Sequence, residues 1–131
     1  MKALNIIESA YRGTIEEQDD TIVWLTHAMK GAGADLAVLL RGNAVNYAAL
    51  GQDAAGLAFG GWRQTQPPRL ADDITALVAK GVAVYVLSED LAERGLGPGD
   101  ILNGVERVGR DSLPQLLAGY DQVWHLSLIH I

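Results

Sequence analysis

Residues 82–90 read Val-Ala-Val-Tyr-Val-Leu-Ser-Glu-Asp, and they carry the clearest indication of the fold. The first six are apolar and rich in β-branched side chains, which is typical of a strand buried on both faces. Ser88 follows as an expected N-cap, and Glu89 and Asp90 place negative charge in the first turn of a helix that runs through Arg94. A strand that passes directly into a helix predicts one unit of a parallel sheet.

The same alternation of apolar runs and amphipathic segments continues along the chain. Further strands are predicted at residues 3–7, 35–40, 105–108 and 122–126, and further helices begin at Thr14, Ala44, Leu70 and Ser112. Strands that are apolar on both faces and alternate with helices indicate a parallel sheet covered on both sides, with right-handed crossovers. The sequence therefore predicts an α/β fold, a three-layer α/β/α sandwich with a mainly parallel five-stranded sheet, built by residues 1–126 as a single domain.

Local signals predict details of the helices. One face of the first helix is expected to be buried, because apolar residues recur there at spacings of three or four: Ile22, Leu25, Met29 and Ala32. Thr14 and Ser112 each begin a capping-box pattern, in which side chains satisfy the free N–H groups of a helix start. We also expect a helical turn at residues 100–103.

Two segments depart from the alternating pattern. Residues 51–68 are rich in Gly, Ala and Gln, and we expect a long excursion with one helical turn. Within it, Trp62 and Arg63 are residue types favoured as interface anchors, so they predict a protein contact unless they simply cover the edge of the core. Residues 127–131 add apolar side chains after the last strand. They extend that strand, pack on a neighbour or form a non-native tail, and we favour the tail.

Composition excludes several classes of function. The chain has 131 residues and a formal net charge of −6, so we expect neither a nucleic-acid nor an anionic membrane partner, both of which need clustered positive charge. It contains no cysteine, which excludes disulfides, cysteine-bound zinc and thiol chemistry. The N-terminal apolar stretch is too short for a signal peptide, and no run approaches a membrane span of ~20 residues. We therefore expect a cytoplasmic protein.

Several short strings in the chain stand in an informative order. They are Lys2 to Glu8, Gly42-Asn43-Ala44-Val45, Lys80 to Val86, Glu93-Arg94-Gly95-Leu96, Leu102-Asn103-Gly104-Val105 and Tyr120-Asp121-Gln122-Val123. In their order and spacing, over residues 2–126, they resemble the DsrE/DsrF-like family, the sulfur-relay fold. The resemblance implies a three-layer domain that assembles as homo-oligomers, either trimers or hexamers.

The resemblance also locates a missing group. In catalytic members of the family, a cysteine just after the third strand carries a persulfide, and here that place is taken by Leu87-Ser88-Glu89. A serine oxygen cannot hold a persulfide sulfur as a thiolate does. We therefore interpret the chain as a non-catalytic, homo-oligomeric domain that binds a protein partner or a small ligand. The alternatives are an enzyme that uses polar groups at the sheet edge, and a structural subunit of a sulfurtransferase complex.

Polar residues follow the carboxyl ends of the predicted strands, where ligands bind in open α/β sheets. The candidate ligand-binding residues are Glu8, Ser9, Arg12, Asn43, Asn46, Tyr47, Ser88 and Glu89. These residues would form a pocket for a small polar or anionic ligand, which could lie at a subunit interface. The alternative is that they are the caps and turn residues expected at any sheet edge.

No metal site or cofactor is predicted. Glu16, Asp19 and Asp20 lie at helical spacing, but charges at a helix start explain them better than a cation site does. His27 is interpreted as a packed surface residue, and His125 lies too near the C-terminus to support a site.

Overall fold

Five parallel strands form the centre of the protein in its computed structural model, which describes residues 2–8, 21–50, 58–63 and 70–125. The strands are β1 (Lys2–Ile7), β2 (Asp35–Leu40), β5 (Ala83–Leu87), β6 (Val105–Val108) and β7 (Gln122–His125). They lie in the order β6-β5-β2-β1-β7, and every neighbouring pair is parallel. Each of the five predicted strands is confirmed to within one residue at either end.

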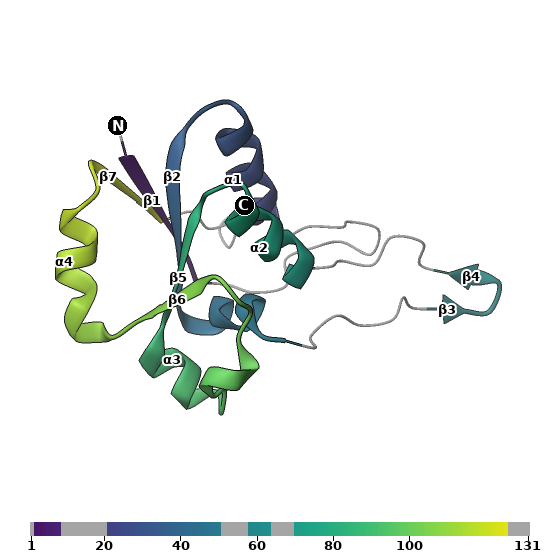
Figure 1. The fold of residues 1–131 in the computed structure, drawn as a ribbon. Helices are drawn as coiled ribbons and strands as arrows, with labels where there is room; N and C mark the ends of the chain where they lie inside the picture. The colour runs from purple at the N-terminus through teal and green to yellow at the C-terminus, as the bar shows by residue number, and fades with distance from the viewer. Residues whose placement is uncertain (1, 9–20, 51–57, 64–69, 126–131) are drawn as a thin grey trace.

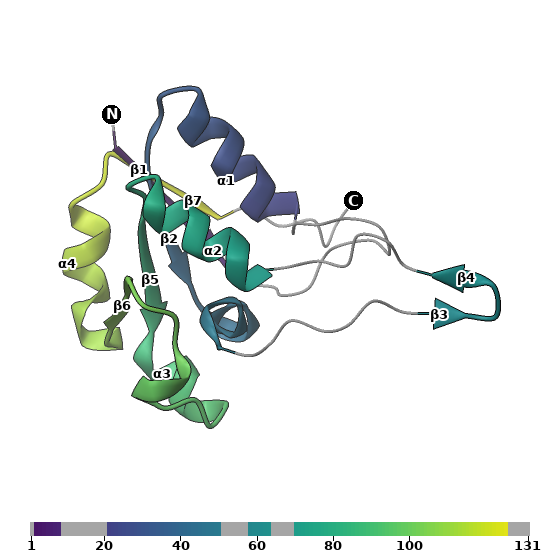
Figure 2. The ribbon, with the colours of Figure 1, turned by 45° about the vertical axis from the view of Figure 1, so that its right-hand side comes forward.

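Helices cover both faces of this sheet (Figure 1). On one face lie α1 (Thr21–Gly31) and α2 (Leu70–Ala79), and on the other lies α4 (Leu113–Ala118), as Figure 2 shows from a second direction. The helix α3 (Ser88–Glu93) and the 3-10 helix η1 (Gly42–Ala48) lie near the lower end of the sheet in both views. Two short 3-10 turns, η2 (Pro98–Asp100) and η3 (Arg110–Ser112), complete the connections. The predicted three-layer α/β/α arrangement is confirmed.

The two faces of the sheet bury very different amounts of apolar surface, because alternate residues of each strand point to opposite sides. On the α1/α2 face, Tyr47 of η1 and Ile74 and Leu77 of α2 pack fully buried against the strands. On the α4 face the fully packed set is small, and the residues of α4 that meet it, such as Leu116, are only partly buried. The α4 layer is therefore the thinner cover.

The predicted buried face of the first helix is wrong in part. Leu25 is 37% exposed, whereas the neighbouring Thr26 is only 1% exposed. The reason lies in β1, where Asn5 is a buried polar residue in an otherwise apolar strand and donates a hydrogen bond to the Thr26 hydroxyl at 3.2 Å. Burying an amide without a partner is costly, so α1 presents its hydroxyl to the strand at this point. The predicted helix start at Thr14 lies outside the described residues.

One predicted cap is wrong, and a second is right in its position but not in its side-chain bond. Leu87, not Ser88, is the N-cap of α3, and Ser88 is the first residue inside the helix. Ser112 precedes α4 but makes no side-chain capping bond, because η3 has already turned the chain and leaves Ser112 in a helical conformation. The predicted turn at residues 100–103 lies earlier, at η2, and the chain at Ile101 forms a bridge to Ala49.

Part of the long excursion between η1 and α2 is a β-hairpin. The two-residue strands β3 (Ala58–Phe59) and β4 (Trp62–Arg63) pair antiparallel, and Gly60 supplies the positive φ of +54° that the turn needs. Figures 1 and 2 both show this hairpin away from the central sheet. The helical turn expected here does not occur in residues 58–63, and the rest of the excursion lies outside the described residues.

Within the described ranges, none of the helices is long and apolar enough to cross a membrane.

Candidate functional site

The carboxyl ends of all five strands meet at one edge of the sheet, because the strands run in the same direction. The chain steps from β1 to β2, β5 and β6 in one direction, and then returns past them to β7 by way of α4. With right-handed crossovers, the connections that leave β5 and β6 therefore run to opposite faces of the sheet. The carboxyl ends of these two strands form the topological switch point, which is where α/β proteins usually bind ligands.

Ser88 and Glu89 lie at this switch point, but both are bonded to the chain across it. The Ser88 hydroxyl donates to the main-chain carbonyl of Val108 at 3.1 Å. Both carboxylate oxygens of Glu89 accept from the main-chain N–H of Arg110 at 3.0 Å. Arg110 is the first residue of η3, so the Glu89 carboxylate occupies the place that an anion would take at a helix start. These contacts join the end of β5 to the end of β6.

Asp90 forms the next contact along the edge, between α3 and η1. Its carboxylate is largely buried, with 9% of the residue exposed, and it accepts from the Gly42 N–H at 2.7 Å. Gly42 has a φ of +57°, and a Cβ there would lie 3.2 Å from the carbonyl oxygen of Glu8. Only glycine therefore lets β1, η1 and α3 approach this closely.

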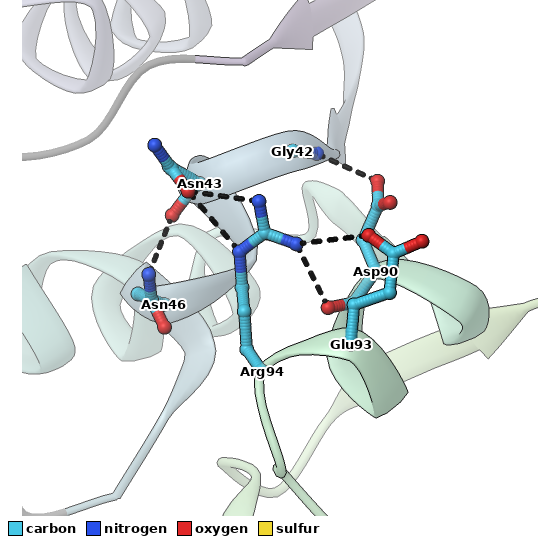
Figure 3. Close-up of polar contacts among 6 residues, drawn as sticks. All are labelled: Gly42, Asn43, Asn46, Asp90, Glu93 and Arg94. Atoms are coloured by element: carbon cyan, nitrogen blue, oxygen red, sulfur yellow. Dashed lines mark hydrogen bonds and ion pairs between the residues drawn. The ribbon is translucent and has the colours of Figure 1, made fainter.

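Arg94 completes this second contact (Figure 3). Its Nε and Nη2 atoms donate to the Asn43 side-chain oxygen at 3.2 and 2.8 Å, and its Nη1 donates to the Asp90 carbonyl at 3.1 Å. Glu93 lies 3.7 Å from the same guanidinium. Asn46 in turn donates to the Asn43 carbonyl at 3.0 Å. The predicted residues Asn43 and Asn46 thus contact each other within η1, and Arg94, which was not among the predicted site residues, joins Asn43 to the end of α3.

A third cluster joins the ends of β2, β1 and β7. The Glu8 carboxylate contacts Arg41 Nε at 3.2 Å through one oxygen and His125 Nε2 at 3.0 Å through the other. All three side chains are about half exposed, at 40%, 43% and 53% for Glu8, Arg41 and His125. We call these three residues the edge triad. Each surface ion pair by itself contributes little to stability, so the triad is better suited to contacting another molecule than to holding the fold.

The remaining predicted site residues do not join these contacts. Tyr47 is fully buried in the core beneath η1 and does not line an open surface. Ser9 and Arg12 lie outside the described residues, as do Glu16, Asp19 and Asp20. Trp62 and Arg63 form β4, but the structure does not describe their side chains, so the predicted protein contact stays a prediction.

The sequence predicts Arg41 and Asp90 at the rim where their strands end, but neither is among the candidate ligand-binding residues named above, and sequence reasoning missed the contacts of Arg94 and His125. One signal was available for Asp90 and Arg94, since residues four apart in a helix lie on the same face. In the structure, however, Arg94 contacts the main-chain carbonyl of Asp90, and the Asp90 carboxylate contacts Gly42. In the parts of the chain that the structure describes, no three or more His, Asp or Glu side chains gather in a way that could hold a metal ion. The carboxyl edge of the sheet offers paired charges and amides for recognition. At the ends of β5 and β6, the Ser88 and Glu89 side chains are already bonded to main-chain groups.

Known proteins resemble this chain in structure but not in sequence. No protein-family model matches it, and no curated protein matches it in sequence. The crystal structure of ychN from E. coli superposes with a TM-score of 0.68 at 21% identity, covering 96% of this chain and all of the other. A protein of unknown function from Methanobacterium thermoautotrophicum, MTH1491, superposes with a TM-score of 0.62 at 13% identity, covering 95% of this chain and 97% of the other. The chain therefore has the DsrE-like α/β fold that its sequence predicted.

Proposed function

We propose that this chain is a non-catalytic DsrE-like domain that assembles with copies of itself and binds a protein partner or a small ligand at the carboxyl edge of its sheet. The resemblance links such a role to sulfur relay, in which a scaffold without a sulfur carrier would act by binding.

The observation that carries the proposal is the bonding of Ser88 and Glu89. They take the place at which catalytic members of the family carry a persulfide cysteine. The Ser88 hydroxyl donates its proton to a main-chain carbonyl and not to a base that would activate it. Glu89 holds the start of η3 with both of its carboxylate oxygens. Both side chains serve to close the switch point, which supports a binding role over a chemical one.

The edge triad supports binding at the exposed part of the same edge. Glu8 contacts Arg41 and His125 only where all three side chains are open to water. A partner with a carboxylate or phosphate would exchange with Glu8 for Arg41, and a partner with a cation would pair with Glu8. Such exchange leaves the buried Asp90–Gly42 contact unchanged.

Self-assembly is supported by the thin α4 layer. Val123 pairs in register with Leu4, whose side chain points to the α4 face, so Val123 points to that face too. It is 43% exposed there. An exposed apolar side chain next to a thin helical cover is a suitable contact for a second copy.

The non-catalytic assignment is tested by sulfur loading. The purified protein is mixed with a low-molecular-weight persulfide that carries labelled sulfur, and protein-bound label is measured after gel filtration. We expect none on the natural chain, since it has no cysteine. Stable label on the natural chain would contradict the proposal.

A gain-of-function variant tests the position. Ser88→Cys should load sulfur faster than Ala32→Cys, a control variant at an exposed position between α1 and the amino end of β2. Equal loading of the two would show that position 88 is not the place of the family's sulfur carrier. Sedimentation velocity tests the assembly, and a monomer at all concentrations would contradict it.

A further inference from the structure

A lysine, a histidine and a main-chain carbonyl are joined by two contacts between α1 and the α2 region. His27 Nε2 lies 3.0 Å from the carbonyl oxygen of Asp73, and His27 Nδ1 lies 2.9 Å from Lys80 Nζ. His27 is half-buried, and Lys80 is exposed just after the end of α2. The two contacts join residues 46 and 53 positions apart, so they depend on the packing of the two helices.

The chemistry of the partners assigns a role to each ring nitrogen of His27. A carbonyl oxygen only accepts hydrogen bonds, so Nε2 is the atom that donates to Asp73. A lysine ammonium only donates, so Nδ1 is the atom that accepts from Lys80. The acceptor atom of the ring is therefore directed at the lysine nitrogen.

This is the arrangement of an activated nucleophile: an amine, a base within hydrogen-bond reach and a third group that orients the base. We propose that Lys80 is a site of acylation by activated acyl groups, specifically acyl thioesters, with His27 as the base. The Lys80 ammonium first gives one proton to solvent. The amine nitrogen then forms a bond to the acyl carbon, and the carbon–sulfur bond breaks. His27 Nδ1 takes the second proton that the nitrogen loses and returns it to the departing thiolate, so that an amide, a thiol and one proton in solvent result and His27 is regenerated.

The hydrogen bond between Lys80 and His27 also has an effect that opposes acylation. It stabilises the ammonium form of the lysine, which cannot attack a carbonyl. Acceleration requires that removing the proton during attack is limiting, as general-base catalysis implies. The two effects predict opposite outcomes, because the first makes Lys80 slower than an ordinary lysine and the second makes it faster.

Acylation would also change the structure around the site. The ammonium that now donates to His27 becomes a neutral amide, so the charged contact between α1 and the end of α2 is lost. The charged residues to consider are Asp73 of α2, which contacts His27 through its main-chain carbonyl, Lys80, which follows the end of α2, and Lys30, one turn further along α1.

The chain supplies its own reference sites, because it contains only three lysines: Lys2, Lys30 and Lys80. The whole protein is incubated with acetyl-CoA at pH 8, and acetylation of each lysine is followed by peptide mass spectrometry. General bases contribute ~10²–10⁴-fold in enclosed active sites. For this half-buried base we expect Lys80 to react about tenfold faster than Lys2 and Lys30.

The variant His27→Gln separates the base from the fold, since glutamine can still donate to the Asp73 carbonyl but is not basic. It should reduce the Lys80 rate to that of the other two lysines and leave their rates unchanged. Unchanged rates at Lys2 and Lys30, with an unchanged circular dichroism spectrum, confirm that the variant folds. Equal or slower reaction of Lys80 in the natural protein would overturn the proposal, as would a His27→Gln variant whose Lys80 reacts as fast as before.

Discussion

The Arg94 guanidinium holds the side-chain oxygen of Asn43 between two of its nitrogens, at 2.8 and 3.2 Å. The two residues are 51 positions apart. Their contact joins the end of α3, which follows β5, to η1, which follows β2. A planar guanidinium with its donors in a fixed fork suits this geometry, whereas a lysine ammonium does not.

Replacing Arg94 with lysine should therefore destabilise the protein, although the positive charge is retained. We expect a loss of about 0.5–1.5 kcal/mol in the free energy of unfolding, the net contribution of a typical hydrogen bond, measured by urea denaturation. The neighbouring Glu93 is 68% exposed and provides the control. Glu93→Gln should change the free energy by less than ~0.5 kcal/mol. Equal effects of the two changes would show that the Arg94–Asn43 contact is only incidental.

Gly42→Ala should destabilise the carboxyl edge through the backbone. The φ of +57° costs an alanine ~1–2 kcal/mol, and its Cβ would lie 3.2 Å from the Glu8 carbonyl. The control is Gly31→Ala at the end of α1, where φ is not positive and a Cβ meets no atom of the described structure within 4 Å. Thermal unfolding should show a lower Tm for the first variant and little change for the second. A Gly42→Ala protein as stable as the natural one would contradict the close approach of η1 to β1.

Tyr120 should make the fold sensitive to alkali. Burial raises the pKa of its phenol well above the usual value, and the hydrogen bond with Tyr85 and the nearby charges of Asp35 and Glu106 raise it further. The folded state therefore favours the protonated phenol more than the unfolded state does. This stabilisation is complete below the unfolded pKa of about 10 and is lost as the pH rises beyond it.

Urea denaturation at pH 8 to 11 tests this sign. The free energy of unfolding should fall above about pH 10, and less steeply in Tyr120→Phe, which has no proton to lose. In the Tyr120→Phe variant, absorbance at the phenolate band should show one titrating tyrosine fewer than in the natural protein. This difference should appear only at the highest pH. A slope unchanged by the substitution would show that Tyr120 does not control the response.

Val123→Ser should weaken self-assembly if the α4 face is the contact. The substitution removes an apolar side chain that is 43% exposed on that face. Leu25→Ser is the matched control, since Leu25 is 37% exposed on α1 on the opposite side of the sheet. Sedimentation velocity should show a shift to smaller species for Val123→Ser alone. A shift for Leu25→Ser alone would place the contact on the α1 side.

The sheet could be predicted because each of its strands appears as an apolar run within a short stretch of sequence. Runs such as Val82 to Leu87 are too apolar and too β-branched to stand anywhere but between two layers, and the glycines and caps around them set their limits. The two-residue strands β3 and β4 carry no such pattern, since their pairing is set by a glycine turn and not by alternation. A segment that short cannot be told from a loop by hydrophobic periodicity.

The sequence could predict that polar residues gather at the carboxyl edge of the sheet, but not which contacts they make there. Parallel strands bring Glu8, Asn43 and Ser88 to one side of the molecule, whatever else the chain does. Which atoms then meet depends on tertiary packing, and so Ser88 bonds to Val108 and not to its own helix. For the same reason, a single buried amide at Asn5 was enough to rotate the expected face of α1 toward Thr26.

The position of β7 beside β1 has a consequence for how the protein is made. Its partners in the sheet are about 120 positions earlier in the chain, as the main-chain bond from Asp121 to the Lys2 carbonyl at 2.8 Å illustrates. Contacts at such separation form late, since the cost of closing so long a loop must first be met. During synthesis, the apolar residues Leu4 and Ile6 would stay exposed to solvent until α4 and β7 emerge from the ribosome. We therefore expect a chain stopped before α4 to be prone to aggregation and to bind chaperones, whereas the complete fold is not.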